Sequence, residues 1–149
     1  MPGSLLDTSV WLAAVFAPHP FHAVAQKSLQ QATAAEPAVF CRSTQQSFLR
    51  LASTPALLKA YGAVGLTNQD ALVALSALQA LPQVCEREEP PGTFVLWQRL
   101  ASRGTASPKV WMDAYLAAFA ICGGLRMLSL DQDFKNFVPQ GLEFKLIGH

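Results

Sequence analysis

Short apolar runs alternate with longer segments of helical spacing along the chain, and this alternation predicts the fold. Four runs are short and apolar enough to form buried strands. They are GSLLD (3–7), PAVFC (37–41), LRMLSLD (125–131) and EFKLIG (143–148). A fifth stretch, QVCEREEPPG (83–92), fits either a short edge strand or a loop.

The segments between these runs carry apolar residues at helical intervals. The predicted helices span 9–16, 21–35, 43–53, 66–81, 93–104 and 107–124. Thr8 or Ser9 could cap the first of them. Thr67, followed three residues later by Asp70, forms a capping signal for the fourth, and two glycines end the last.

Strands separated by helices predict an α/β fold, a three-layer-like sandwich in which helices flank a mostly parallel central sheet. The length of 149 residues is typical of one domain, so we expect a single domain over 1–149. The carboxyl ends of parallel strands gather at one edge of the sheet, and ligands bind there. That edge is the first place to search for function.

Composition and charge narrow the class of protein. Apolar residues make up 51% of the chain and charged residues 14%, which is typical of a folded globular protein. No apolar run reaches the roughly 18 residues of a membrane span, and the start MPGSLLDTSVW lacks the basic region of a signal peptide. The three cysteines fit no metal-binding spacing, so we expect a reducing, cytoplasmic location. With a net charge of +1, nucleic-acid binding would need a local basic patch.

Three aspartates stand where the predicted edge would bring them together. Asp7 ends the first strand, Asp131 ends the run RMLSLD, and Asp113 lies in the first turns of the last long helix. Three carboxylates at one edge repel one another unless a cation joins them, and Mg²⁺ or Mn²⁺ prefers such oxygen ligands. Asp133 could reach the same ion directly or through water. Taken singly, each aspartate also fits a cap or a turn.

The motifs LLDTSVW, TQQSFLRLAS, MDAYLAAFA and LSLDQDF resemble those of PIN-domain proteins, specifically VapC-type toxins of type II toxin–antitoxin systems. Their order and spacing cover nearly the whole chain, and DAYLA together with SLDQDF is the most specific part. Proteins of that family are Mg²⁺- or Mn²⁺-dependent endoribonucleases blocked by an antitoxin. The resemblance implies that the catalytic and metal-binding acids are Asp7, Asp113 and Asp131, that Asp133 is an additional metal ligand, and that Thr8 and Ser9 support the first acid.

One position departs from the family pattern. The resemblance implies a glutamate near the start of the helix after the second strand, and the matching residue is Gln45. Glutamine keeps a carbonyl oxygen but lacks the negative charge and cannot act as a base. Glu36, the nearest glutamate, precedes that strand and is expected at the opposite sheet edge. The aspartates could suffice for activity, or the site could be weakened or inactive, through a natural or an engineered loss of the acid.

RNA binding would need positive charge near the acidic edge. Arg42 and Arg50 flank the start of the glutamine-bearing helix, and Lys109 precedes Asp113, although ordinary surface solvation explains the same residues. The stretch ALVALSALQAL (71–81) is apolar on more than one face, which fits a homodimer surface, a groove for a partner helix, or burial within the monomer. The family resemblance favours a homodimer and a groove for a VapB-type antitoxin.

Three functions can be compared on these grounds. The first is a metal-dependent endoribonuclease toxin that cleaves structured cellular RNA, tRNA or rRNA, and is neutralised by its antitoxin. The alternative, which Gln45 favours, is a PIN-like module that binds RNA or a partner without cleaving it. Phosphotransfer with Asp7 as the nucleophile ranks last, because DTSVW lacks a second aspartate two residues on.

Overall fold

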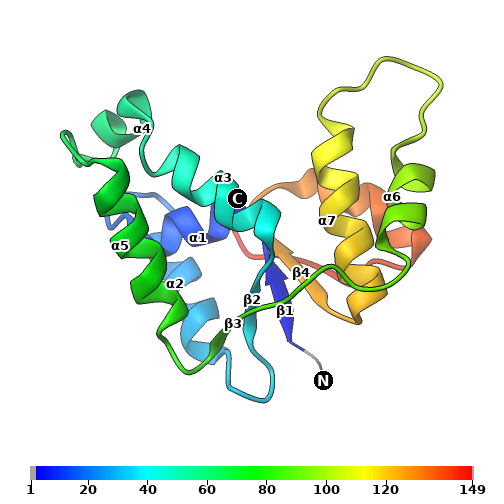
Figure 1. Ribbon diagram of the computed structural model, residues 1–149, viewed down its shortest axis with the longest axis horizontal. Helices are drawn as coiled ribbons and strands as arrows, with labels where there is room; N and C mark the ends of the chain where they lie inside the picture. The colour runs from blue at the N-terminus through cyan, green and yellow to red at the C-terminus, as the bar shows by residue number, and fades with distance from the viewer. Residues whose placement is uncertain (1–2, 149) are drawn as a thin grey trace.

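The computed structural model describes residues 3–148 and contains a five-stranded sheet with helices on both faces (Figure 1). The strands are β1 (Ser4–Leu6), β2 (Ala38–Phe40), β3 (Val84–Glu86), β4 (Arg126–Ser129) and β5 (Phe144–Leu146). They lie in the order β3-β2-β1-β4-β5, and every neighbouring pair is parallel. The predicted α/β sandwich is confirmed, and the ambiguous stretch 83–92 supplies the edge strand β3.

All of the predicted helices are present, with ends that differ from the apolar pattern by a few residues. The helices are α1 (Thr8–Val15), α2 (His22–Gln31), α3 (Arg42–Leu51), α4 (Pro55–Ala60), α5 (Asn68–Gln79), α6 (Thr93–Ala101), α7 (Val110–Gly123) and a 3₁₀ helix, η1 (Gln132–Gln140). The sequence did not predict α4 or η1, because α4 has only 6 residues and η1 has three residues per turn. Within residues 3–148, no helix is long and apolar enough to cross a membrane.

The sheet is buried on both faces because a strand places successive side chains on opposite sides. Leu6, Phe40 and Leu128 belong to the core that α1–α5 cover. Leu5 and Met127, their neighbours along the strands, pack instead against the core that α6, α7 and η1 cover. A sheet covered on both faces needs continuously apolar strands, and this explains why the strands were recognisable as short apolar runs.

The connections at the carboxyl edge of the sheet begin with polar residues. Asp7 joins β1 to α1 as the helix cap, and its carboxylate accepts the N–H of Thr8 at 2.8 Å. The prediction that Thr8 or Ser9 caps α1 is therefore wrong, because the acid itself takes that place. Asp131 caps η1 in the same way after β4, accepting the N–H of Asp133 at 2.9 Å. The two acids thus follow neighbouring strands at one edge.

Candidate active site

The carboxylates of Asp113, Asp131 and Asp133 meet at the carboxyl edge of the sheet. One oxygen of each lies within 4.8 Å of the others. Asp131 and Asp133 come from the start of η1, whereas Asp113 comes from the first turn of α7. Such a set of hard oxygen donors fits Mg²⁺ or Mn²⁺. The structure therefore brings together three of the four predicted acids, and their roles stay a prediction.

Asp7 is held separately, by three hydrogen-bond donors. The N–H of Thr8 donates to Oδ1 at 2.8 Å, and the hydroxyls of Ser9 and Ser129 donate to Oδ2 at 3.2 and 2.8 Å. Thr8 thus contributes its backbone and Ser9 its hydroxyl to the support of this acid. The site divides into three clustered carboxylates and a fourth whose orientation is fixed by hydrogen bonds.

Ser129 connects the two parts of the site, and the sequence analysis did not single it out. Its side chain is 0% exposed at the end of β4. Its Oγ donates to Asp7 and accepts the N–H of Asp131 at 2.9 Å. A lone serine inside the apolar run RMLSL was the available signal, because a buried hydroxyl needs partners.

Burial and mutual repulsion raise the pKa of two of these acids. Burial raises the pKa of Asp7, against the lowering effect of its hydrogen bonds. Burial also raises the pKa of Asp113, to about 6; the neighbouring carboxylates add to this rise, and Lys109 opposes it. The edge therefore concentrates negative charge, which a cation would stabilise.

Lys109 places its ammonium against two of the clustered acids. Its Nζ lies 2.8 Å from Oδ2 of Asp131 and 2.7 Å from Oδ2 of Asp133, and its side chain is 63% exposed. Partial burial raises the pKa of Asp131, but hydrogen bonds from Lys109 and from the N–H of Asp133 lower that pKa below its usual value. The hydrogen bonds to both acids raise the pKa of Lys109. The lysine that the sequence suggested as an RNA contact thus offsets part of the negative charge of two acids in this structure.

Comparisons with known proteins identify the family. A model of the PIN domain matches residues 4–138. Ribonuclease VapC41 of Mycobacterium tuberculosis is 40% identical over 144 residues, which cover 96% of this chain and 97% of that protein. The chain belongs to the PIN-domain family. Ribonuclease VapC31 of the same organism is 30% identical to this PIN domain over 134 residues, or 89% of this chain and 92% of the relative. The predicted resemblance to VapC proteins is confirmed.

Two solved structures share the architecture of this PIN domain. VapBC2 from Rickettsia felis, bound to a DNA fragment from its promoter, matches with a TM-score of 0.67 at 11% identity, over 95% of this chain and 96% of that chain. VapC20 of Mycobacterium tuberculosis, a toxin that cleaves the sarcin–ricin loop, matches with a TM-score of 0.61 at 17% identity, over 94% and 96%. At such low identity the likeness concerns the fold alone, and it confirms the predicted sheet and helices.

Gln45, where PIN-domain proteins are expected to carry a glutamate, is tied into the packing of two helices. Its side chain is 4% exposed. Its Oε1 accepts a hydrogen bond from Arg42 at 2.8 Å, and its Nε2 donates to Gln79 of α5 at 2.7 Å. Arg42 also pairs with Glu86 of β3 at 3.1 Å. The amide therefore joins α3 to α5, and a carboxylate in its place would have an arginine partner.

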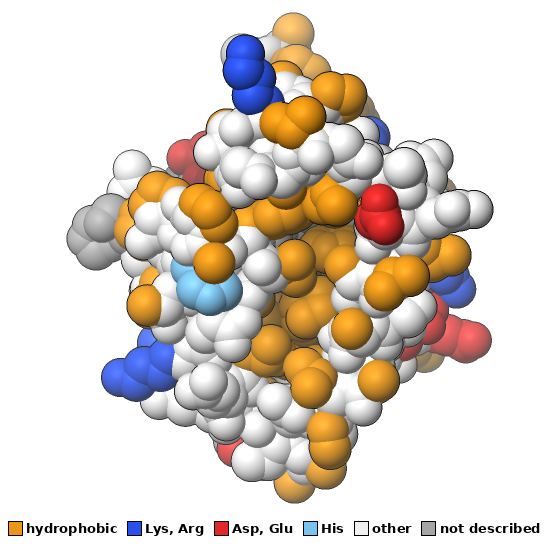
Figure 2. All heavy atoms as spheres, turned by 90° about the vertical axis from the view of Figure 1, so that its left-hand side faces the viewer, with side chains coloured by type: hydrophobic (Ala, Val, Ile, Leu, Met, Phe, Trp, Pro, Cys, Tyr) orange, Lys and Arg blue, Asp and Glu red, His pale blue; other side chains and the backbone are white. Residues whose placement is uncertain are grey.

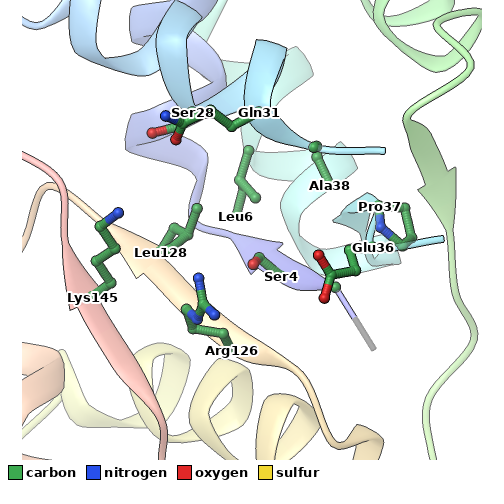
Figure 3. Close-up of a pocket in the computed structure, with 12 residues that line it drawn as sticks. Ser4, Leu6, Ser28, Gln31, Glu36, Pro37, Ala38, Arg126, Leu128 and Lys145 are labelled. Carbon is green, nitrogen blue, oxygen red and sulfur yellow. The ribbon is translucent and has the colours of Figure 1, made fainter. Parts of the chain in front are cut away.

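Two of the residues weighed from the sequence lie elsewhere in this PIN domain. Arg50 occupies the last turn of α3, about 12 Å along the helix axis from Arg42. The prediction that both arginines flank the start of this helix is therefore wrong for Arg50. Glu36 lines a pocket of about 90 Å³ with Ser4 and Arg126, at the amino-terminal edge of the sheet (Figure 3). This is the edge opposite the acids, as predicted, so Glu36 does not replace the missing glutamate.

Proposed function

We propose that the protein is a metal-dependent endoribonuclease toxin of the VapC type, acting as a single PIN domain over 1–149 on structured cellular RNA such as tRNA or rRNA. The observation that carries this proposal is the cluster of Asp113, Asp131 and Asp133 within 4.8 Å at the strand edge. The similarity of the chain to ribonucleases of the VapC group supports the choice of RNA as substrate. A cytoplasmic location belongs to the same proposal, because such RNA is encountered there.

The four aspartates take different parts in this proposal. Asp113, Asp131 and Asp133 hold Mg²⁺ or Mn²⁺ through their clustered oxygens, and Asp7 is a further ligand that completes the acidic edge. When bound, a divalent cation supplies charge that offsets the negative charge developing on the phosphodiester, and it makes water more acidic. Ser129 keeps the carboxylate of Asp7 in one orientation through its hydrogen bond at 2.8 Å.

Metal removal is the direct test of the proposed function. The purified protein, incubated with total RNA and Mn²⁺ or Mg²⁺, is expected to cleave it, as resolved on a denaturing gel. Excess EDTA should stop cleavage completely, because the clustered carboxylates supply no positive charge of their own to the phosphodiester. Cleavage that continues in EDTA would contradict a metal-dependent nuclease.

Gln45→Glu separates the proposed nuclease from a module that binds RNA without cleaving it. The added carboxylate is expected to be tolerated, because Arg42 already donates to this position at 2.8 Å. If the unchanged protein cleaves RNA, the aspartates suffice and Gln45 is a tolerated departure. If only the Gln45→Glu protein cleaves, the unchanged chain is the binding module, and our proposal of a nuclease is wrong for this sequence.

Lys109→Gln should tighten the binding of Mn²⁺ by about tenfold. The ammonium of Lys109 pairs with Asp131 and Asp133, so a divalent cation that binds these acids has to displace it or share its partners. These pairs are exposed, and each contributes at most about 1 kcal/mol, which sets the size of the effect. Isothermal titration calorimetry with Mn²⁺ measures it. Once displaced, Lys109 is free to contact RNA, so the same variant should raise the KM for RNA.

Lys135→Gln is the matched control for this change. Lys135 is exposed on η1, and within residues 3–148 it makes no ion pair with the clustered acids. Its replacement by glutamine removes the same charge as Lys109→Gln. Its replacement should leave Mn²⁺ affinity within about twofold, since exposed charges that are not in contact interact weakly. Weaker Mn²⁺ binding in Lys109→Gln would mean that the lysine organises the acids instead of competing for them.

A VapB-type antitoxin and a second copy of the chain are the protein partners in this proposal. Figure 2 shows hydrophobic side chains gathered in a hollow on the face of the molecule to which α4 and α5 belong. Leu72 and Val73 of α5 are exposed, and Leu72 lines an apolar pocket of about 300 Å³ with Leu49. An amphipathic antitoxin helix would bury these side chains. Because Leu75 and Leu78 of the same helix are buried in the monomer, only part of its apolar surface is left for partners.

A further inference from the structure

A groove lies between α6 and η1, outside the acidic cluster. Its volume is about 810 Å³. Two guanidinium groups, Arg99 and Arg103, and two amides, Asn136 and Gln140, line it above a floor that includes Leu100 and Phe137. The floor residues are buried, whereas the four polar residues are exposed. The groove thus offers hydrogen-bond donors over an apolar base.

The charge of this groove is entirely positive. None of the residues that line it is acidic. Within the described part of the chain, neither Arg99 nor Arg103 forms an ion pair, whereas Arg42, Lys109 and Arg126 are all paired with carboxylates. An unpaired guanidinium donates readily to a phosphate, often through two parallel hydrogen bonds. The groove therefore suits a polyanion.

Both walls of the groove are connected along the chain to residues of the acidic site. Asp133 lies in the first turn of η1, and Asn136 follows three residues later on the same 3₁₀ helix. With three residues per turn the two side chains share a face, separated by about 6 Å along the axis. On the other wall, the segment after α6 leads from Arg103 to Lys109, whose ammonium contacts the acids. A chain bound at the acids could therefore extend directly into the groove.

We propose that this groove binds the sugar–phosphate backbone of a single-stranded part of the RNA substrate, next to the bond that is cut. The inference rests on the proposed function, since it extends the substrate site of that nuclease. Arg99 and Arg103 contact successive phosphates, and Asn136 and Gln140 supply donors and acceptors for ribose hydroxyls or base edges. Because Phe137 is buried, the groove reads the backbone more than it stacks bases.

The test uses a double variant, Arg99→Gln with Arg103→Gln, and measures binding of a short fluorescein-labelled single-stranded RNA of mixed sequence. The dissociation constant should rise on the order of tenfold. The slope of the logarithm of the binding constant against the logarithm of salt concentration should become shallower by about 1.4, or about 0.7 for each lost phosphate contact. KM for RNA cleavage should rise similarly while kcat changes little, because neither arginine touches the acids. The affinity for Mn²⁺ should stay unchanged.

Two further variants keep the test decisive. Lys27→Gln with Lys59→Gln removes the same charge from exposed positions on α2 and α4, and it should leave RNA binding unchanged. Asn136→Asp with Gln140→Glu keeps side-chain shape but adds negative charge to the groove, and it should weaken RNA binding at least as much as the arginine variant. Thermal melting checks that each variant is folded.

The outcomes distinguish a failure of the groove proposal from a failure of the proposed nuclease function. If the unchanged protein cleaves RNA and the arginine variant binds and cleaves it equally well, the groove proposal is overturned and the proposed function stands. If the unchanged protein neither binds nor cleaves RNA, both are overturned. If the arginine variant keeps RNA binding but loses a VapB-type antitoxin, the groove is a protein-binding surface and the RNA proposal is wrong.

Discussion

Asp113→Asn is expected to lower the rate of RNA cleavage by about 10³-fold, because a bound cation contributes several kcal/mol to the transition state. Asp113 has an oxygen within 4.8 Å of those of Asp131 and Asp133. Burial raises its pKa to about 6, and the neighbouring carboxylates add to this rise, so a cation at this position would stabilise its charged form. Asparagine keeps the size of the side chain but removes the charge that holds the cation. The initial rate of cleavage in Mn²⁺ measures the effect.

Asp70→Asn is the matched control for this change. Asp70 is an exposed aspartate in the first turn of α5, where it accepts the N–H of the capping residue Thr67 at 2.8 Å, and it is not one of the clustered acids. Its replacement removes the same charge and should leave the cleavage rate within about twofold, since an exposed cap affects mainly local helix stability. In the absence of metal, Asp113→Asn should melt no earlier than the unchanged protein, because it relieves repulsion among the acids. An Asp113→Asn protein that cleaves RNA at a normal rate would show that the cluster is not the catalytic centre.

The strands and the edge that carries the acids could be predicted because their causes are local in the sequence. A parallel sheet buried on both faces needs short, continuously apolar strands, and Leu5 and Leu6 illustrate this by pointing into different cores. Given strands that all run in one direction, a residue at the end of a strand has only one possible edge. Asp7 and Asp131 therefore could be placed on the same edge before their contacts were known.

The contacts around the acids could not be predicted, because they join residues far apart in the chain. Lys109 reaches Asp133 only because the start of α7 lies over the start of η1, and no pattern around Lys109 indicates this. In the sequence, Arg99 and Arg103 look like ordinary solvated charges at the end of a predicted helix, and only η1 on the opposite side makes them one wall of a groove. η1 itself was missed, since the helical period used to find helices is longer than three.

Ser129→Ala is expected to weaken Mn²⁺ binding by about 10- to 100-fold, the usual cost of losing a partner that orients a metal ligand. Ser129 Oγ donates to Asp7 at 2.8 Å and accepts the N–H of Asp131 at 2.9 Å, so it sets the positions of two acids together. Because the side chain is 0% exposed, water cannot replace these bonds, and the free energy of unfolding should fall by about 1–3 kcal/mol. Calorimetric titration with Mn²⁺ and thermal melting of the metal-free protein measure the two effects.

Ser9→Ala provides the comparison that separates orientation of the acids from general stability. Ser9 also donates to Asp7, but at 3.2 Å, and it accepts the N–H of Leu130 at 3.4 Å instead of that of Asp131. Its loss disturbs one acid through a longer bond and should weaken Mn²⁺ binding less than the loss of Ser129 does. If Ser129→Ala lowers stability but binds Mn²⁺ as tightly as the unchanged protein, Ser129 supports the fold alone. We expect Ser129→Ala to lose more Mn²⁺ affinity than Ser9→Ala, because the hydroxyl of Ser129 fixes the positions of two acids, Asp7 and Asp131, relative to each other.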